Sequence, residues 1–132
     1  NAVVELCYSG REKAEVKRML GSEAGVYSYL GTKDFREVEK KMNDGDKEAT
    51  LVFRALAYQL AKDIGSMAAV LRFRVDAIVY TGGMAYSESL CREITSYVSK
   101  VAPVICLPGE EEMRSLAEGA LRVLHGGKCS EY

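Results

Sequence analysis

The chain has 132 residues, a formal net charge of −1, 48% hydrophobic residues and 28% charged residues. This length supports one domain with a core of its own, and the balanced charge provides no field that would attract nucleic acid or an anionic membrane surface. No apolar run approaches the roughly 20 residues that a membrane-spanning helix needs. We therefore expect a globular protein with neither nucleic acid nor a membrane as its partner.

The first part of the chain shows one helical pattern and one irregular stretch. It opens with NAVVELCYSG, which has no initiating Met and starts inside an apolar run, so we expect a piece of a longer polypeptide. In segment 11–20, Val16 and Leu20 share one face among charged residues, which predicts a helix. Segment 22–32 has glycines near both ends and is expected to be a short extended stretch or a loop.

A second helix is predicted over segment 33–43. It places Phe35 and Val38 at helical spacing, and either Thr32 or Asp34 is available as its N-cap. The residues that follow, Asn-Asp-Gly-Asp, are typical of a turn and should end this helix.

The longest predicted element is a helix over about 47–73, with Asp46 as its N-cap. Its apolar residues form one continuous stripe that alanines widen, and an apolar face this broad is normally buried against other elements. We interpret the helix as part of the core rather than as a ligand site. The same stripe would also suit an interface between copies of the chain, and we expect a homo-oligomer.

The second half, about 75–125, is predicted to be strand, helix, strand, helix. VDAIVYT and PVICLP are short apolar runs, and SESLCREITSYVSKV between them has helical periodicity. A strand–helix–strand unit of this length forms a right-handed parallel crossover, so the fold class is α/β. Parallel sheets need neighbouring strands, and only VYSYL offers a further weak candidate, which again indicates an incomplete piece.

The cysteines and the single histidine do not predict a structural zinc site. Cys91 and Cys106 lie inside apolar patterns and are interpreted as buried thiols, without a C-x-x-C pair. We expect a reduced, cytoplasmic protein. A structural zinc site needs clustered Cys or His ligands, and His125, at the end of the last helix, is a poor catalytic candidate.

The most informative stretch is VDAIVYTGGMAYSESL, where Gly82 and Gly83 end a buried strand. In open α/β sheets, ligands bind in the crevice beyond the carboxyl ends of the strands, and glycine lets a ligand approach the backbone. The alternative interpretation is a tight strand-to-helix turn without a ligand, and spacing alone leaves both open. Neither G-x-G-x-x-G nor G-x-x-x-x-G-K-[ST] occurs.

Two other clusters of polar residues are candidate sites. Glu110, Glu111 and Glu112 open the last helix, where carboxylates stabilise the helix dipole and, at the lip of a nucleotide site, would hold Mg²⁺. Asp34 and Arg36 are interpreted either as a helix cap and a solvated charge, or as residues that contact a base or a phosphate.

Six segments together carry a family resemblance. In chain order these are CYSG, YLGTKDFREVE, AYQLAKDIGSMAAVL, VDAIVYTGGMAYS, APVICLPGEEEM and LAEGALRVL. They resemble the C-terminal part of the butyrate kinases, within the acetate and butyrate kinase family. The resemblance implies a ribonuclease-H-like domain of the actin, Hsp70 and sugar kinase superfamily, here incomplete, with 1–132 forming a single nucleotide-binding domain.

The resemblance also implies an activity, reversible phosphoryl transfer from ATP to butanoate that gives ADP and butanoyl phosphate, with Mg²⁺. TGGMAYS matches the superfamily's adenosine motif, and DFR resembles the ATP-contacting D-x-R segment of acetate kinases. Glu111 aligns with a magnesium-associated glutamate, although a register slip to Glu110 or Glu112 is open. The implied nucleotide-binding residues are Gly82, Gly83, Met84, Ala85, Ser87, Asp34, Phe35 and Arg36.

The resemblance places several functional motifs of the family upstream of Asn1. The family's phosphate motifs and the residues that bind the acyl group lie there, so the short-chain carboxylate should bind to a preceding domain. We expect no catalytic residue in this chain and an inactive piece when it stands alone. MAYS replaces the acetate kinase sequence IGEN, which favours butanoate over acetate. The alternatives are a kinase for another short or branched acid, and a non-catalytic piece that acts only in oligomerisation.

Overall fold

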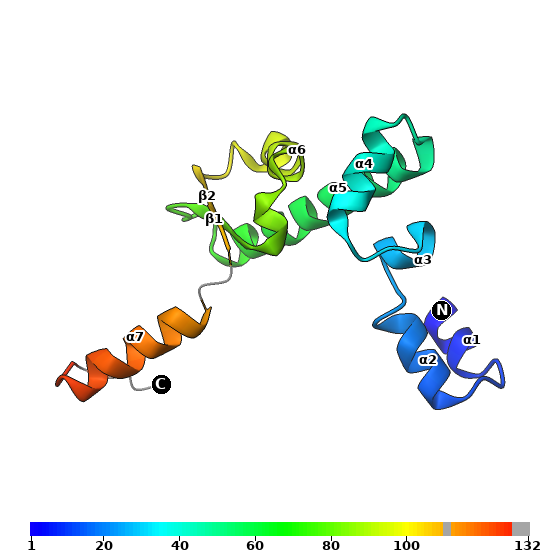
Figure 1. The fold of residues 1–132 in the computed structure, drawn as a ribbon, viewed down its shortest axis with the longest axis horizontal. Coiled ribbons are helices and arrows are strands. Elements are labelled where there is room, and N and C mark those ends of the chain that lie inside the picture. Colours follow the sequence, from blue (N-terminus) through cyan, green and yellow to red (C-terminus); the bar gives the residue numbers. More distant parts are fainter. Residues whose placement is uncertain (110–111, 128–132) are drawn as a thin grey trace. The chain divides into compact units, whose positions relative to one another are not determined.

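The computed structural model describes residues 1–109 and 112–127 and is rich in helix (Figure 1). The chain divides into two compact units, Asn1–Ile64 and Gly65–Tyr132, with the boundary inside the longest helix. Each unit is described by itself below, and a single domain over 1–132 stays a prediction. None of the described helices combines the length and apolar character that crossing a membrane requires.

The first unit is built from helices. Its elements are α1 (Ala2–Cys7), α2 (Lys13–Leu20), α3 (Val26–Leu30), α4 (Phe35–Asn43) and the first part of α5 (Lys47–Val70). Side-chain caps start several of them: Asp34 accepts a hydrogen bond from the backbone N–H of Arg36 at 3.0 Å, and Asp46 accepts from Glu48 and Ala49 at 2.9 and 3.0 Å. The predicted helices α2, α4 and α5 and the caps Asp34 and Asp46 are therefore confirmed.

The expectation of an extended stretch or loop at 22–32 was wrong, because this segment contains helix α3. Gly25 precedes the helix with a φ of 64°, and Gly31 ends it in the left-handed conformation with a φ of 69°. Valine and tyrosine are common in strands, but this preference depends strongly on the structural context. Here the two glycines allow one short helical turn, which the buried side chain of Leu30 anchors.

Helices α4 and α5 enclose the core of the first unit. Val38 of α4 is completely buried. The rings of Phe35 and Phe53 stack with centroids 5.7 Å apart, which joins the two helices. Lys41 donates a hydrogen bond to the carbonyl oxygen of Leu30 at 3.1 Å and so ties α4 to the end of α3.

Helix α5 ends at Val70 and not at 73 as predicted. Arg72 and Phe73 have φ angles of 54° and 57°, in the left-handed region. The N–H of Phe73 donates to the carbonyl of Ala68 at 2.8 Å and the N–H of Arg72 donates to Ala69 at 2.9 Å. This is the Schellman arrangement, which closes a helix, and here it forms without the glycine that usually marks it.

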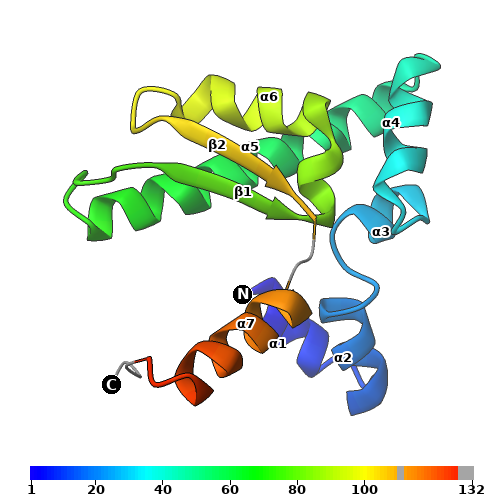
Figure 2. The same cartoon turned by 60° about the vertical axis from the view of Figure 1, so that its left-hand side comes forward.

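The second unit contains the predicted strand–helix–strand–helix order. Its elements after α5 are β1 (Ile78–Gly82), a 3₁₀ turn η1 (Gly83–Tyr86), α6 (Glu88–Val98), β2 (Val104–Pro108) and α7 (Glu112–Leu124). The two strands are parallel neighbours, in a register that runs from Ile78 opposite Val104 to Gly82 opposite Pro108 (Figure 2). The α/β class is confirmed.

Helix α6 covers one face of the strand pair. The hydroxyl groups of Tyr80 on β1 and Thr95 on α6 lie 3.3 Å apart, and Leu90, Ile94 and Val98 are buried along α6. The opposite face carries Val79, Ile105 and Leu107, which are 51%, 45% and 58% exposed. Parallel sheets normally have both faces covered, so this face is the incomplete part of the fold within the described residues.

Candidate functional site

The carboxyl ends of β1 and β2 meet through two glycines. The N–H of Gly82 donates to the carbonyl of Gly109 at 3.1 Å, and the N–H of Gly109 donates to the carbonyl of Gly82 at 3.4 Å. The hydroxyl group of Thr81 also lies 3.5 Å from the Gly109 carbonyl. The sheet therefore ends in a short bridge made of backbone atoms.

Gly82 is required by its conformation rather than by crowding. Its φ and ψ of 78° and −174° lie in a region that only glycine readily occupies. A Cβ atom added to Gly82 would meet no atom within 4 Å. The space beside this backbone is thus open, which agrees with either a ligand or solvent there.

Gly109 is different, because a side chain of the same unit lies against it. Its φ is 117°, and an added Cβ would lie 3.3 Å from the hydroxyl oxygen of Tyr86. Tyr86, in the turn after β1, therefore reaches across to the end of β2 while its side chain stays 70% exposed. Tyr86 is not among the site residues predicted from the sequence, because its position in the motif gives no indication of this contact.

After Gly82 the motif forms a short turn before the next helix begins. Gly83–Tyr86 form the 3₁₀ turn η1, and α6 begins only at Glu88. Ser87 is the N-cap, because its hydroxyl accepts a hydrogen bond from the N–H of Leu90 at 3.0 Å. Ala85 and Ser87 are buried whereas Met84 is exposed, so the first two hold the turn in place and Met84 faces the surroundings.

Two cysteines contact the backbone of this turn. The sulfur atoms of Cys91 on α6 and Cys106 on β2 are 3.6 Å apart, and both thiols are within hydrogen-bonding distance of the Ala85 carbonyl. Cys106 is exposed and Cys91 is half-buried. The prediction that Cys106 is a buried thiol was therefore wrong. Cys106 is exposed because, within the described residues, β2 has no strand on its outer side. Burial, and secondly the neighbouring Cys106, raise the pKa of Cys91 to about 11.

In the first unit, Asp34 and Arg36 form a two-pronged ion pair. The carboxylate oxygens of Asp34 accept from Nε and Nη2 of Arg36 at 3.0 and 2.6 Å. The side-chain hydrogen bond from Arg36, followed by the one from its backbone, lowers the pKa of the Asp34 carboxyl group below 3.8. The guanidinium group remains 88% exposed, so its planar surface is available to a ligand.

The predicted metal residue lies outside the described residues. Glu111, like Glu110, belongs to the part for which no structure is given, and the metal prediction stays a prediction. Within residues 1–109 and 112–127, no three His, Cys, Asp or Glu side chains lie close enough together to hold a metal ion. Phe35, predicted to contact nucleotide, is placed in the stack with Phe53.

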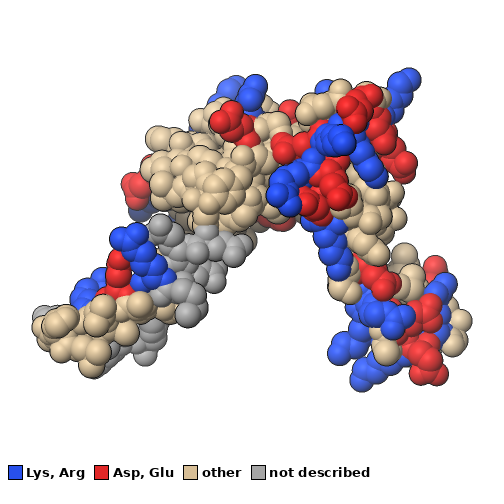
Figure 3. All heavy atoms as spheres, viewed as in Figure 1, with Lys and Arg blue, Asp and Glu red and all other residues tan. Residues whose placement is uncertain are grey.

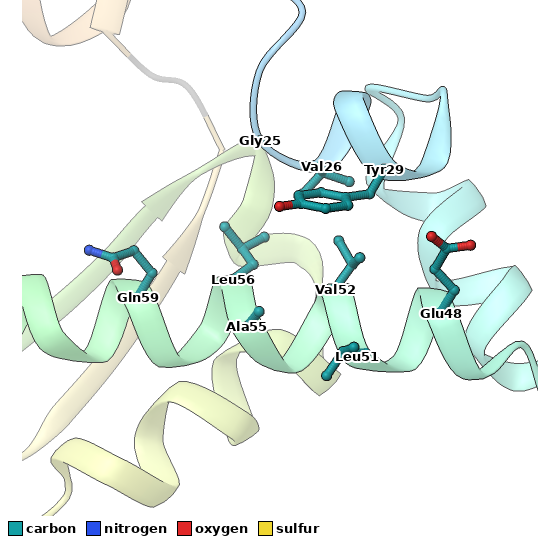
Figure 4. Close-up of a pocket in the computed structure, with 9 residues that line it drawn as sticks. All are labelled: Gly25, Val26, Tyr29, Glu48, Leu51, Val52, Ala55, Leu56 and Gln59. Atoms are coloured by element: carbon teal, nitrogen blue, oxygen red, sulfur yellow. The ribbon is translucent and has the colours of Figure 1, made fainter. Parts of the chain in front are cut away.

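A hollow of about 590 Å³ lies between α3 and α5 in the first unit (Figure 4). The close-up shows the Tyr29 ring above Val52, with Glu48 and Gln59 toward the two ends of the α5 side. The residues that line it are Gly25, Val26, Tyr29, Glu48, Leu51, Val52, Ala55, Leu56 and Gln59. The lining is mostly apolar and includes a carboxylate but no cation, so it is unsuited to phosphate. Sequence reasoning missed it because α3 was not predicted.

Charged side chains of both signs are mixed over α2 and α4 in the view of Figure 3, while the surface over β2 and α6 shows few charges. On the face shown, neither sign forms a large continuous patch. This mixture of signs fits the net charge of −1.

Residues 6–115 of the chain match the Acetokinase family. The chain is also similar to a protein named probable butyrate kinase 2 from Caldanaerobacter subterraneus subsp. tengcongensis, with 50% identity over 125 residues. That alignment covers 94% of this chain and 35% of the relative. The chain thus spans about a third of the length of the curated relative it matches.

Two solved structures have a similar fold. The crystal structure of Porphyromonas gingivalis acetate kinase matches with a TM-score of 0.80 at 20% identity, over 93% of this chain and 37% of that chain. A propionate kinase from Francisella tularensis subsp. tularensis SCHU S4 matches with a TM-score of 0.68 at 22% identity, over 85% and 35%. At these identities the likeness establishes the fold, and the predicted α/β fold class is confirmed.

Proposed function

The chain belongs to the acetokinase family, and from that premise we propose that it is the nucleotide-binding C-terminal part of a carboxylate kinase. The reaction is phosphoryl transfer from ATP to a short-chain carboxylate, giving ADP and an acyl phosphate. We propose butanoate as the preferred acid. The observation that carries this choice is the 50% identity to a probable butyrate kinase over 94% of the chain.

The nucleotide contacts in the second unit are proposed at the end of β1. Gly82 has open space beside its backbone, and Gly83 and Met84 follow on the exposed turn. A nucleoside lying there would meet flat backbone and the flexible Met84 side chain, which adapts to aromatic surfaces. Ala85 and Ser87 would act from below by fixing the turn, since both are buried.

The first unit contributes the segment Asp34–Phe35–Arg36. Asp34 holds the guanidinium group of Arg36 through two hydrogen bonds, which limits its rotation while leaving it exposed. A planar, fixed guanidinium group stacks on an aromatic base or binds a phosphate through paired hydrogen bonds. Phe35 supports this arrangement through its ring stack with Phe53.

Magnesium is proposed as the accompanying metal ion. In phosphoryl-transfer sites Mg²⁺ is usually bound by one or two carboxylates together with substrate phosphates and water. The proposed protein ligand is Glu111, with Glu110 or Glu112 as the alternatives in register. When bound, the ion would neutralise charge on the transferred phosphate.

The remaining features of the proposal concern the whole protein. A short-chain carboxylate would bind through a preceding domain, the protein would form a homo-oligomer, and it would act in the cytoplasm. A kinase for a shorter acid is the second candidate, because acetate and propionate kinases share the fold. Because the acid would bind through the preceding domain, the full-length protein that contains this chain would be assayed with butanoate, propanoate, acetate and isobutanoate in competition. Acyl phosphate formation fastest with butanoate supports the proposal, whereas preference for another acid favours the second candidate.

Nucleotide binding is tested on the chain itself by titrating isotopically labelled protein with Mg·ADP in an NMR experiment. We expect shifts at Gly82 to Ser87 and at Asp34 to Arg36, and loss of binding in Gly83→Val. Gly119→Val is the matched control, because Gly119 lies within helix α7 and an added Cβ there meets no atom within 4 Å. Equal ADP affinity in Gly83→Val and in the unchanged chain would contradict the proposed site.

A further inference from the structure

Cys91, Cys106 and the carbonyl group of Ala85 form a triangle of contacts in the second unit. The two sulfur atoms are 3.6 Å apart, and the Ala85 oxygen lies 3.6 Å from Cys91 and 3.4 Å from Cys106. The cysteines come from different elements, α6 and β2, and are 15 positions apart in the sequence. Two thiols in contact need only a small movement to reach the bond length of about 2 Å in a disulfide.

The two thiols differ in accessibility, which sets the order in which they would react. Cys106 is exposed and Cys91 is half-buried. Burial raises the pKa of Cys91 to about 11, and a thiol attacks as its thiolate. Cys106 is therefore the thiol that meets a reagent first, and Cys91 is positioned to react with it afterwards.

We propose that Cys91 and Cys106 form a thiol–disulfide exchange site that takes small disulfides of the glutathione class. The Cys106 thiolate attacks the small disulfide RSSR, its S–S bond breaks, and RS⁻ leaves and takes up the proton that Cys106 released. The Cys91 sulfur then attacks the mixed disulfide at Cys106 and displaces a second RS⁻, which takes up the Cys91 proton. The protein loses two hydrogen atoms and RSSR is reduced to two RSH.

This reaction would act on the turn above it. The two thiols are the hydrogen-bond donors that the structure gives to the Ala85 carbonyl, and Ala85 itself is buried. A disulfide has no S–H group, so oxidation leaves the Ala85 carbonyl without either of these donors. The new S–S bond also joins α6 to β2. The turn Gly83–Tyr86 must then readjust. We expect this readjustment to weaken nucleotide binding, an effect that rests on the function proposed above.

The first experiment isolates the pair in a Cys7→Ser/Cys129→Ser background, where the remaining thiols are Cys91 and Cys106. The protein is treated with oxidised glutathione and analysed by mass spectrometry and thiol counting. We expect loss of both thiols and a protein lighter by two hydrogen atoms. A Cys91→Ser variant should instead keep a stable glutathione adduct on Cys106. In the protein that keeps both Cys91 and Cys106, a stable glutathione adduct or two unreacted thiols would overturn the proposal. That outcome does not depend on whether the Cys91→Ser variant folds.

The second experiment separates the thiol chemistry from the nucleotide. Amide resonances of Ala85, Tyr86 and Ser87 in the oxidised and reduced forms are compared without ADP, and we expect the largest shifts there, reversed by dithiothreitol. Unchanged resonances in the oxidised protein would overturn the coupling to the turn. Titration of both forms with Mg·ADP should then give weaker binding to the oxidised form. Absence of binding to the reduced form counts against the proposed function alone, while equal affinity of the two forms counts against the coupling.

Discussion

Gly82 and Gly109 exchange two backbone hydrogen bonds across the ends of neighbouring parallel strands, with N···O distances of 3.1 and 3.4 Å. Parallel strands do not ordinarily pair in this way, because their hydrogen bonds are evenly spaced and slanted. Both residues have positive φ angles, 78° and 117°, a conformation that glycine adopts readily. The carboxyl ends of β1 and β2 are thereby fixed to each other before the chain continues into the η1 turn.

Replacing Gly82 by alanine should destabilise the protein by about 1–3 kcal/mol, the usual range for a residue forced into a glycine conformation. The cause is backbone strain alone, since an added Cβ meets no atom within 4 Å. Gly65→Ala is the matched control: Gly65 lies inside helix α5, where alanine should stabilise by about 0.5–1 kcal/mol. Urea unfolding of both variants gives the comparison, and effects of the same sign would contradict this account.

Removing the cap of α6 should also be measurable. In Ser87→Ala the N–H of Leu90 loses its acceptor at 3.0 Å, and such N-cap replacements cost about 1 kcal/mol. Ser99→Ala at the other end of the same helix changes an exposed serine and should leave the free energy of unfolding nearly unchanged. If the two variants unfold at the same urea concentration, Ser87 does not act as a cap.

Stability at acid pH should depend on Arg36. Because its hydrogen bonds lower the pKa of Asp34 below 3.8 in the folded protein, the pair stabilises the fold above pH 3.8, and this contribution is lost as pH falls through the lowered pKa. Arg36→Gln should reduce stability above pH 3.8 and match the unchanged protein at more acid pH.

The same variant allows a direct titration. A ¹³C NMR titration of the Asp34 carboxyl group should show its pKa rising toward 3.8 in Arg36→Gln, whereas Arg54→Gln, an exposed arginine on α5, should leave it unchanged. A pKa that is the same in all three proteins would mean that the ion pair does not persist in solution.

Alkylation should distinguish the cysteines. A pKa raised from 9.0 to about 11 leaves Cys91 with about 100-fold less thiolate at pH 8 than an unshifted thiol has. Since iodoacetamide reacts with thiolates, Cys91 should be modified about 100-fold more slowly than expected for an unshifted thiol, with a rate that still rises above pH 9. Cys7, which is exposed, provides the fast reference, and equal rates at the two positions would contradict the shift.

The sequence predicted the fold where one pattern extended over many residues. The long stripe of α5 and the periodicity of α6 located both helices, and Asp46 marked a start that the structure confirms. The five-residue α3 was missed because one helical turn offers too few positions for a period. The end of α5 was misplaced because Arg72 adopts the left-handed conformation that a sequence marks only when glycine occupies it.

The candidate site was predictable only in its local part. Adjacent glycines after an apolar run located the turn that follows β1, and Gly82 does have a conformation that needs glycine. Contacts between residues on different strands and helices could not be predicted from the sequence. The approach of Tyr86 to Gly109 and the pairing of Cys91 with Cys106 depend on the strand register and on where α6 crosses, which no spacing along the chain specifies.

The strand pair also determines how the chain behaves in concentrated solution. Within the described residues β1 and β2 pair only with each other, so each leaves an outer row of backbone donors and acceptors that invites another strand. Val79 and Ile105 stand beside these rows at 51% and 45% exposure. Turbidity should therefore increase steeply with protein concentration, and a lysine in place of Ile105 should keep more concentrated samples clear.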